Sequence, residues 1–562
     1  MPQVGSDSAG ALPGAGRARI VLVGFEAQDN LGVRYLSSRL RQAGHGTRIV
    51  AYGRGPGPII EAVRALQPHV VGFSLLFQYL VPNLARLLAE LRTAGVDAHF
   101  TVGGHYASFE PEALLRAATQ LDSVVRFEGE ETLLELAERL AAGLPWRDVR
   151  GIAYRAPGGI VGTPLRPGRA HLDELPWPDR DDIPYERQPL PIASVLGSRG
   201  CPWNCSFCSI TPFYQRNGTT GRRLRHPLRV VDELEHLHRQ RGVCVILWQD
   251  DDFLAGGPPA RAWAHAVARE CVRRDLHRGL RWKISCRSDE VTLEALQPLE
   301  EAGLRHVYLG VEAGDPEDLA HLNKRLSPEV HLRAGEVLRG LQLSFDFGYM
   351  LLNPWSTFRS ARRNLTFLRD FTRGGYAGAV FSRMLPYAGT LAAQRLRAEG
   401  RLLKEDVCAD YEFLDPRLDR FYNWLLETFA GRNTTSSGTL NLLRLRLFEA
   451  NLNLPERPVD ATRLGILRSL IAVSNRIALD TLEEGLNYVE GRPDVAAEDP
   501  FLRRLTEHHL AQDARLREDL AILDAQSADA AGLQMPAPPC YSSLSPAVCP
   551  TSAGQPEEEG CP

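Results

Sequence analysis

The chain has 562 residues, of which 44% are apolar and 24% charged, with a formal net charge of -4. This length and composition indicate a folded protein of roughly two to four domains and exclude a fibrous or disordered class. The small negative charge gives no general attraction to nucleic acid or to anionic membranes, and no apolar run approaches the about 20 residues that span a bilayer. The N-terminus resembles no secretory signal. We therefore expect a cytoplasmic protein without nucleic-acid or membrane partners.

The first part of the chain alternates strand-like and helix-like segments. The β-branched run ARIVLVGF predicts a buried strand, and later segments with apolar residues at three- and four-residue steps predict helices that close on glycine. Further strands are predicted at residues 47–53, 69–76, 98–104 and 123–130. Over residues 18–145 this alternation predicts an α/β domain with a doubly wound, Rossmann-like parallel sheet.

Ligands of such a sheet bind at the carboxyl ends of its strands. Ser74, Gly103, Gly104 and the stretch 128–130 fall at these ends, and small residues there let a large ligand approach the backbone. No G-x-G-x-x-G follows the first strand, and a phosphate loop is also missing. The sequence therefore favours a ligand other than a dinucleotide.

Five further regions follow or flank this domain. Residues 146–190 combine a hairpin-like segment with a proline-rich linker. A second alternating series at 191–400 predicts a full or partial (β/α) barrel with its chemistry in the carboxyl-end loops, and 401–530 predicts a helical C-terminal region. Residues 1–17 and the proline- and cysteine-containing tail 531–562 are predicted to be disordered.

A cluster of thiols follows the first strand of the second series. In GSRGCPWNCSFCSI, three of the ten cysteines occupy positions Cys201, Cys205 and Cys208. Thiolates bind soft metals, so the loop can hold three corners of an iron-sulfur cluster or most of a zinc site. Zinc needs a fourth ligand nearby, and only Cys244 and His226 offer one, so we favour the cluster.

The spacing Cys-x-x-x-Cys-x-aromatic-Cys resembles that of the radical S-adenosylmethionine enzymes. The resemblance implies that Cys201, Cys205 and Cys208 hold a 4Fe-4S cluster with one open iron. In that family the amino and carboxylate groups of S-adenosylmethionine chelate this iron, and reduction can cleave the molecule to a 5'-deoxyadenosyl radical. Phe207 matches the aromatic residue that packs near the adenine.

Later strand ends resemble the family's contacts with S-adenosylmethionine. Asp251 lies in a run of three aspartates that either contact ligand or cap a helix. Ser285 and Arg287 end the next predicted strand, where the arginine either clamps the methionine carboxylate or pairs with Asp289. Glu312 ends the strand after that, and it either accepts from a ribose hydroxyl or faces solvent.

The first domain resembles the cobalamin-binding domain of one large radical S-adenosylmethionine subgroup, and the resemblance spans about residues 18–395. It implies that Ser74, Gly103 and Gly104 line the nucleotide tail of cobalamin. The segment GFEAQDNLGVRY lacks the histidine of the Asp-x-His-x-x-Gly motif, so cobalt has no lower histidine ligand from that motif. The methylthiotransferase subgroup is disfavoured, because the chain has no cysteine before Cys201.

These resemblances imply a cobalamin-dependent radical S-adenosylmethionine methyltransferase. Its substrate would be a specialised metabolite or peptide, methylated at an unactivated carbon or at a phosphorus. An electron donor such as flavodoxin or ferredoxin is expected. The alternatives are a radical cyclase or rearrangement enzyme with the same cofactors, and a non-catalytic cobalamin-binding protein, against which the cysteine triad argues.

Some aromatic and sulfur residues remain outside this assignment. Tyr387 follows the last predicted barrel strand and either reaches the site or packs in a turn. A second cluster in the tail, built from Cys540, Cys549 and Cys561, is disfavoured by their uneven spacing. An aromatic group in the helical region is predicted to be core rather than substrate contact. Its members are Tyr411, Phe413, Phe421, Tyr422 and Trp424.

Overall fold

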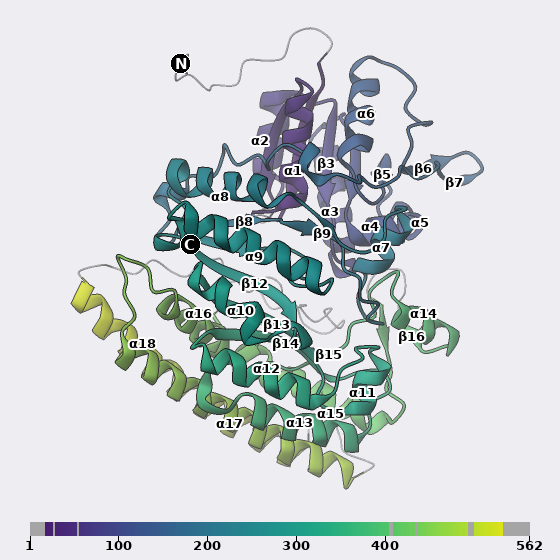
Figure 1. The fold of residues 1–562 in the computed structure, drawn as a ribbon. Helices are drawn as coiled ribbons and strands as arrows, with labels where there is room; N and C mark the ends of the chain where they lie inside the picture. Colours follow the sequence, from purple (N-terminus) through teal and green to yellow (C-terminus); the bar gives the residue numbers. More distant parts are fainter. Residues whose placement is uncertain are drawn as a thin grey trace. The chain divides into compact units, whose positions relative to one another are not determined.

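A computed structural model gives the fold of the chain (Figure 1). It describes residues 17–531 apart from 26–28, 53–54, 404–408, 434, 436 and 493–498. Cys540, Cys549 and Cys561 lie outside the described residues, as does nearly all of both segments predicted to be disordered. The chain divides into two compact units, which are Met1–Glu270 with Tyr387–Gln394, and Cys271–Pro386 with Arg395–Pro562.

The first unit begins with a seven-stranded sheet of order β2-β1-β3-β4-β5-β6-β7. Its first five strands are parallel, and the hairpin of β6 and β7 adds two antiparallel strands to one edge. The strands are β1 (Arg19–Gly24), β2 (Gly46–Ala51), β3 (Val70–Ser74), β4 (His99–Gly103), β5 (Ser123–Val125), β6 (Ile152–Ala156) and β7 (Gly159–Gly162). The predicted doubly wound sheet is confirmed, and the predicted hairpin belongs to the same sheet.

Helices cover both faces of this sheet. Along β1, Val21 and Val23 belong to one buried cluster with residues of α2, α3 and α5, whereas Ile20 and Leu22 belong to another with residues of α1 and α6. Alternate residues of a strand point to opposite faces, so this division is what a doubly wound sheet requires. The helices are α1 (Leu31–Gln42), α2 (Gly57–Leu66), α3 (Val81–Thr93), α4 (His105–Phe109), α5 (Pro111–Ala117) and α6 (Glu130–Ala141).

The first unit continues into the start of the second alternating series. β8 (Ile192–Val195) pairs in parallel with β11 (Val245–Trp248), and β9 (Ser198–Arg199) pairs with β10 (Arg223–Leu224) in the antiparallel sense. Three helices accompany these strands. They are α7 (Ile210–Arg216), α8 (Pro227–Arg241) and α9 (Pro258–Arg273).

The second unit carries the later strands of that series. β12 (Arg281–Arg287), β13 (Leu304–Glu312), β14 (Ser344–Leu352) and β15 (Ser382–Arg383) are parallel neighbours. The whole six-stranded sheet has the order β15-β14-β13-β12-β11-β8, so it keeps two edges and forms a half-barrel. The prediction of a full or partial barrel is thus confirmed in its partial form. Accompanying helices are α10 (Leu293–Glu301), α11 (Pro316–His321), α12 (Pro328–Gly340) and α13 (Phe358–Phe371).

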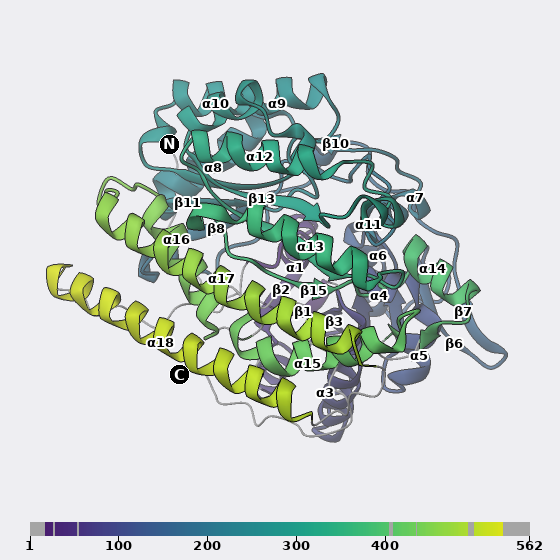
Figure 2. The ribbon, with the colours of Figure 1, turned by 90° about the horizontal axis from the view of Figure 1, so that it is seen from below.

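The rest of the second unit is helical, as predicted. Leu443, Leu467, Ile471 and Leu520 are among the buried residues that join α16, α17 and α18 in one cluster, and Figure 2 shows these helices together. The five aromatic residues predicted to be core are all buried. No helix in the described part of the chain is long and apolar enough to cross a membrane. The helices are α15 (Pro416–Asn433), α16 (Thr439–Asn451), α17 (Ala461–Glu490) and α18 (Pro500–Ala531). Before them come α14 (Leu391–Ala398), which starts in the first unit and ends in the second, and the short pair β16 (Leu402–Leu403) and β17 (Asp410–Tyr411).

A fully buried carboxylate on α8 supplies a test of the first unit. Glu233 accepts from Arg180 at 2.9 Å and from Arg225 at 2.7 Å. Burial opposes its charge, yet the two guanidinium groups hold the pKa of Glu233 below its usual value of 4.5. Glu233→Gln would remove the nearest counter-charge of two buried cations, and breaking a buried pair typically costs about 3–5 kcal/mol.

We expect Glu233→Gln to lower the melting temperature by several degrees at pH 7, measured by thermal denaturation. Because the folded pKa is depressed, this stabilisation is present above pH 4.5 and disappears as the pH falls through the folded value, so the deficit of the variant shrinks in acid. Glu235→Gln on the same helix removes a surface pair with Arg239 and serves as the control, with a change of at most about 1 kcal/mol. Equal effects of the two variants would contradict the interpretation.

Candidate active site: cysteine loop and cobalamin-domain edge

Two carboxylates from the end of β11 fasten the segment that precedes Cys201. Asp250 accepts from the backbone N–H of Gly197 at 2.9 Å, and Asp251 accepts from that of Gly200 at 2.7 Å. Burial raises the pKa of Asp251 to about 6. Asp251 therefore positions the cysteine loop through a backbone hydrogen bond, and its contact with S-adenosylmethionine stays a prediction.

The glycines of GSRG are required by close packing. Gly200 has a φ of +93°, and a Cβ there would lie 2.3 Å from the carbonyl oxygen of Gly221. A Cβ on Gly197 would lie 2.4 Å from the ring of Trp263. The backbone just before Cys201 therefore tolerates no side chain at these two positions.

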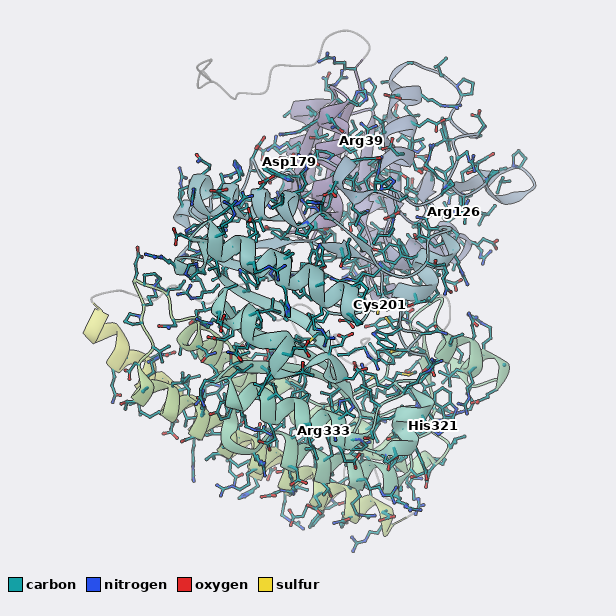
Figure 3. The ribbon with its side chains drawn as sticks, viewed as in Figure 1. Arg39, Arg126, Asp179, Cys201, His321 and Arg333 are labelled. Carbon is teal, nitrogen blue, oxygen red and sulfur yellow. The ribbon has the colours of Figure 1, made fainter. Side chains whose placement is uncertain are left out.

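The three thiols of the predicted cluster site share one short loop and are half-buried (Figure 3 labels Cys201). None is in a disulfide. Burial and the nearby Asp252 raise the pKa of Cys201. The loop is closed by hydrogen bonds from Cys208 N–H to the Cys205 carbonyl at 3.2 Å and from Thr211 Oγ1 to the Cys201 carbonyl at 3.2 Å.

This donor set fits a multi-iron cluster. Within the described residues, no three Cys, His, Asp or Glu side chains meet closely enough to hold one metal ion, so no zinc site joins Cys244 or His226 to the triad. A 4Fe-4S cluster attaches each thiolate to a separate iron, so its ligands need not meet at one point. Phe207 is half-buried within the same loop.

The cobalamin-side candidates lie together at the carboxyl edge of the first sheet. Ser74 and Gly103 are register partners at the ends of β3 and β4. Gly104 has a φ of +117°, and a Cβ there would lie 2.3 Å from the carbonyl oxygen of Leu75. The predicted juxtaposition of Ser74, Gly103 and Gly104 is therefore present, and their contact with cobalamin stays a prediction.

His105 is a residue of this edge that sequence reasoning missed. Its ring stacks on Phe213 of α7, the helix after the cysteine loop, with centroids 4.2 Å apart. Its Nδ1 lies 3.3 Å from the hydroxyl of Ser209. Burial lowers the pKa of His105 to about 4, so the ring is neutral at pH 7. The only sequence signal was its position directly after the Gly103-Gly104 turn.

The carboxylates of the acidic stretch after β5 pair with arginines. Glu128 accepts from Arg199 at 2.9 Å and from Arg223 at 2.9 Å, and Glu130 accepts from Arg199 at 2.7 Å. These side chains are nearly buried. Both carboxylates thus pair with arginines that flank the cysteine loop, and a ligand contact of residues 128–130 stays a prediction.

Tyr387 belongs to the first unit and packs on the loop after β3. Its ring lies 5.8 Å from that of Phe77, which stacks on Tyr79 at 5.4 Å. Of the two roles left open for Tyr387, the structure therefore shows packing, next to the edge that carries Ser74.

In the second unit, Ser285, Arg287 and Glu312 occupy the ends of β12 and β13. Arg287 pairs with Asp289 at 3.0 Å and donates to the carbonyl oxygen of Lys324 at 2.9 Å, so the simple ion pair is present. Glu312 accepts from Lys324 at 3.2 Å. Ser285 lies two residues before Arg287 on β12 and is half-buried.

Glu312 also has an unusual backbone. Its φ is +72°, and the register between β13 and β14 shifts at this point. A non-glycine residue held in the left-handed region at a strand irregularity is typical of functional sites. The conformation supports Glu312 as a site residue.

The half-barrel, the cysteine triad and the preceding doubly wound sheet are together typical of a radical enzyme with an additional cofactor-binding domain. Two family models match the chain, the B12 binding domain over residues 19–137 and the radical SAM superfamily over residues 195–359. Hopanoid C-3 methylase from Methylococcus capsulatus is 30% identical over 422 residues, covering 72% of this chain and 76% of that protein. The chain belongs to the cobalamin-binding radical S-adenosylmethionine enzymes, so its cofactors are a 4Fe-4S cluster, S-adenosylmethionine and cobalamin.

Other proteins are similar over shorter or more distant matches. The anaerobic magnesium-protoporphyrin IX monomethyl ester cyclase of Rubrivivax gelatinosus is 31% identical over 324 residues, covering 55% of this chain and 56% of that protein. The solved structure of the cobalamin-dependent S-adenosylmethionine radical enzyme OxsB superposes with a TM-score of 0.68 at 15% identity, covering 93% of this chain and 82% of that chain. The second match supports the fold.

The glycine before Cys201 gives a direct test of the loop. Gly200→Ala should disrupt the loop because its Cβ would overlap the Gly221 carbonyl. We expect anaerobically reconstituted Gly200→Ala protein to retain less than about a third of the wild-type iron and sulfide. Gly158→Ala is the control, since nothing lies within 4 Å of a Cβ at that exposed turn. Wild-type iron and sulfide in Gly200→Ala would contradict this account.

Proposed function

We propose that the protein is a methyltransferase that places a methyl group on an unactivated carbon, or a phosphorus, of a specialised metabolite or peptide. When bound, the cluster and S-adenosylmethionine supply a 5'-deoxyadenosyl radical, and cobalamin supplies a methyl carrier. Residues 18–145 form the cobalamin-binding domain of this proposal and residues 191–400 its radical core. The similarity to the hopanoid methylase over most of the chain supports methyl transfer.

The observation that carries the proposal is the direct connection between cobalamin edge and cysteine loop within the first unit. His105, next to the Gly103-Gly104 turn, stacks on Phe213 directly after the loop. Arg199, two residues before Cys201, pairs with carboxylates that follow β5. A methyl carrier and a radical source held on one rigid support are what a radical methylation needs.

Within this proposal, each predicted residue has a definite task. Cys201, Cys205 and Cys208 ligate the cluster, and Phe207 packs near the adenine. Asp251 contacts S-adenosylmethionine in this proposal and also positions the Gly200 backbone. The remaining candidates bind cofactors. They are Ser285, Arg287 and Glu312 for S-adenosylmethionine, and Ser74, Gly103 and Gly104 for cobalamin.

The second candidate function is radical ring closure or rearrangement with the same cofactors. The similarity to the magnesium-protoporphyrin cyclase favours it, although that match covers only 55% of this chain. Product mass separates the two functions, since only methylation adds a CH2 unit. In either case we propose a cytoplasmic enzyme that receives electrons from flavodoxin or ferredoxin.

The first experiment is an optical titration of the anaerobically reconstituted enzyme with hydroxocobalamin, a strong reductant and S-adenosylmethionine. We expect protein-bound methylcobalamin to form in an amount close to the bound cobalamin. The variant with Cys201→Ala, Cys205→Ala and Cys208→Ala should lose iron and sulfide and form no deoxyadenosine, yet still bind cobalamin. Cobalamin that binds but is never methylated would favour the cyclase function, and failure to bind would refute the cobalamin assignment.

The strand-end residues of the second unit are tested separately. Arg287→Ala and Glu312→Gln should each lower deoxyadenosine formation at least about tenfold, which corresponds to about 1.4 kcal/mol of lost interaction. Arg305→Ala on β13 removes a partly exposed pair with Glu300 and serves as the control. Unchanged deoxyadenosine formation in either site variant would remove that residue from the cofactor site.

A further inference from the structure

The sheet of the second unit has two unlike faces. Alternate residues of β12, β13 and β14 are apolar and buried, among them Ile284, Val307, Leu309, Phe345 and Phe347. The residues between them are polar or glycine and lie in register across the three strands. They are Lys283, Ser285, His306, Tyr308, Gly310, Ser344, Asp346 and Gly348. A parallel strand covered on both faces reads as a continuous apolar run, so the polar face is not built for packing alone.

Part of this polar face is internally satisfied. Asp346 accepts from Arg444 of α16 at 2.7 Å and pairs with His306 Nε2 at 3.2 Å, while His306 Nδ1 lies 2.9 Å from the Ser344 hydroxyl. Burial opposes the charge of Asp346, yet Arg444 and His306 hold the pKa of Asp346 well below its usual value. Burial lowers the pKa of His306, which is therefore neutral at pH 7. Asp346 and Arg444 thus cancel each other's charge.

The polar face also carries a lysine, Lys283, near the start of β12. Among the described residues its ammonium group makes no hydrogen bond and no ion pair, whereas Lys324 on the same unit pairs with Glu312. The side chain is half-buried, and burial lowers the pKa of Lys283. Taking an ammonium group out of water costs free energy unless an anion pairs with it. Because the described structure supplies no such anion, we infer that Lys283 binds an anion from outside the chain.

Tyr308 lies diagonally across from Lys283, two residues further along the neighbouring strand. Its hydroxyl has no hydrogen-bond partner in the described part of the chain, and the side chain is 36% exposed although β13 is a central strand. Gly348 makes room for it, since a Cβ there would lie 2.7 Å from the Tyr308 hydroxyl oxygen. The face therefore presents one unpaired cation and one unpaired hydroxyl donor.

We propose that this polar face binds the substrate through an anionic group, a carboxylate or a phosphate, which accepts from the Lys283 ammonium and the Tyr308 hydroxyl. Two charge-assisted hydrogen bonds, one from each group, would then satisfy the two unpartnered donors. The inference rests on the proposed function, because it takes the bound molecule to be the substrate of that reaction. It restricts this substrate to molecules that carry a carboxylate or a phosphate. Arg444 is a positioning residue that neutralises Asp346 and leaves the charge of Lys283 uncompensated.

The chain has only the lysines Lys283, Lys324 and Lys404, which makes chemical labelling decisive. The reconstituted holoenzyme is labelled briefly with an acetylating reagent, and each lysine is quantified by peptide mass spectrometry. The probes are inorganic phosphate and tricarballylate, with sodium chloride at matched ionic strength as the reference. We expect Lys283 to be acetylated faster than the paired Lys324, and both probes to slow its acetylation at least about threefold. Tyr308→Phe should weaken this protection without changing the acetylation of Lys324.

Two results would overturn the proposal. Lys283 that is not acetylated under any condition would have a partner within the protein, and acetylation that neither anion slows would show that no anion binds. These readouts require no methyl transfer, so they remain informative if the proposed reaction fails.

Substitution of Lys283 shows whether this residue binds an anion of the substrate or the carboxylate of S-adenosylmethionine. Lys283→Met removes the charge and keeps a side chain of similar length. In the absence of substrate, this variant should form deoxyadenosine at a rate within about twofold of wild type. Lys283→Arg, which restores the charge, should form deoxyadenosine at the same level. Phosphate should raise the melting temperature of Lys283→Arg but not that of Lys283→Met. Loss of deoxyadenosine formation in Lys283→Met would assign Lys283 to the cofactor and refute the proposal.

Discussion

The first unit depends on Arg199, a nearly buried arginine placed two residues before the first cluster cysteine. Its guanidinium group joins Glu128 and Glu130, which follow the last parallel strand of the cobalamin-binding sheet, to the start of the cysteine loop. Breaking such a nearly buried pair by removing one partner leaves a charge that the protein interior cannot solvate. The pairing therefore fixes the loop to the sheet more firmly than surface contacts could, whatever the net free energy of the intact network.

The same principle governs the other side of the loop. Asp250 and Asp251 accept from backbone N–H groups of Gly197 and Gly200, which lie in a segment with no room for side chains. Backbone donors held by buried carboxylates cannot shift without losing charge-assisted hydrogen bonds. The backbone before the cysteines is thus held by contacts within the protein, which lowers the ordering cost of assembling a cluster there.

Sequence patterns were sufficient for the architecture because local periodicity determines it. Alternating strands and helices predicted both sheets, and the three-cysteine spacing predicted the position of the cluster loop. Long-range partners were out of reach. Glu128 and Arg199 are 71 residues apart, and nothing in the stretch after β5 distinguishes a ligand-binding carboxylate from one that pairs with an arginine. His105 was missed for the same reason, since its stacking partner on α7 is more than a hundred residues away.

The polar face of the second unit shows where register adds information that composition lacks. Lys283 and Tyr308 are separated by 25 positions and belong to different strands, and only the pairing of β12 with β13 places them on one face. Asp346 would be the natural partner of Lys283, but Arg444 from α16 takes that role. A fold under selection for stability alone would gain from pairing or replacing an unpartnered ammonium group in such a place. Its retention beside an unpartnered hydroxyl is therefore better explained by a ligand than by packing, and that reasoning connects the half-barrel to the chemistry of what it binds.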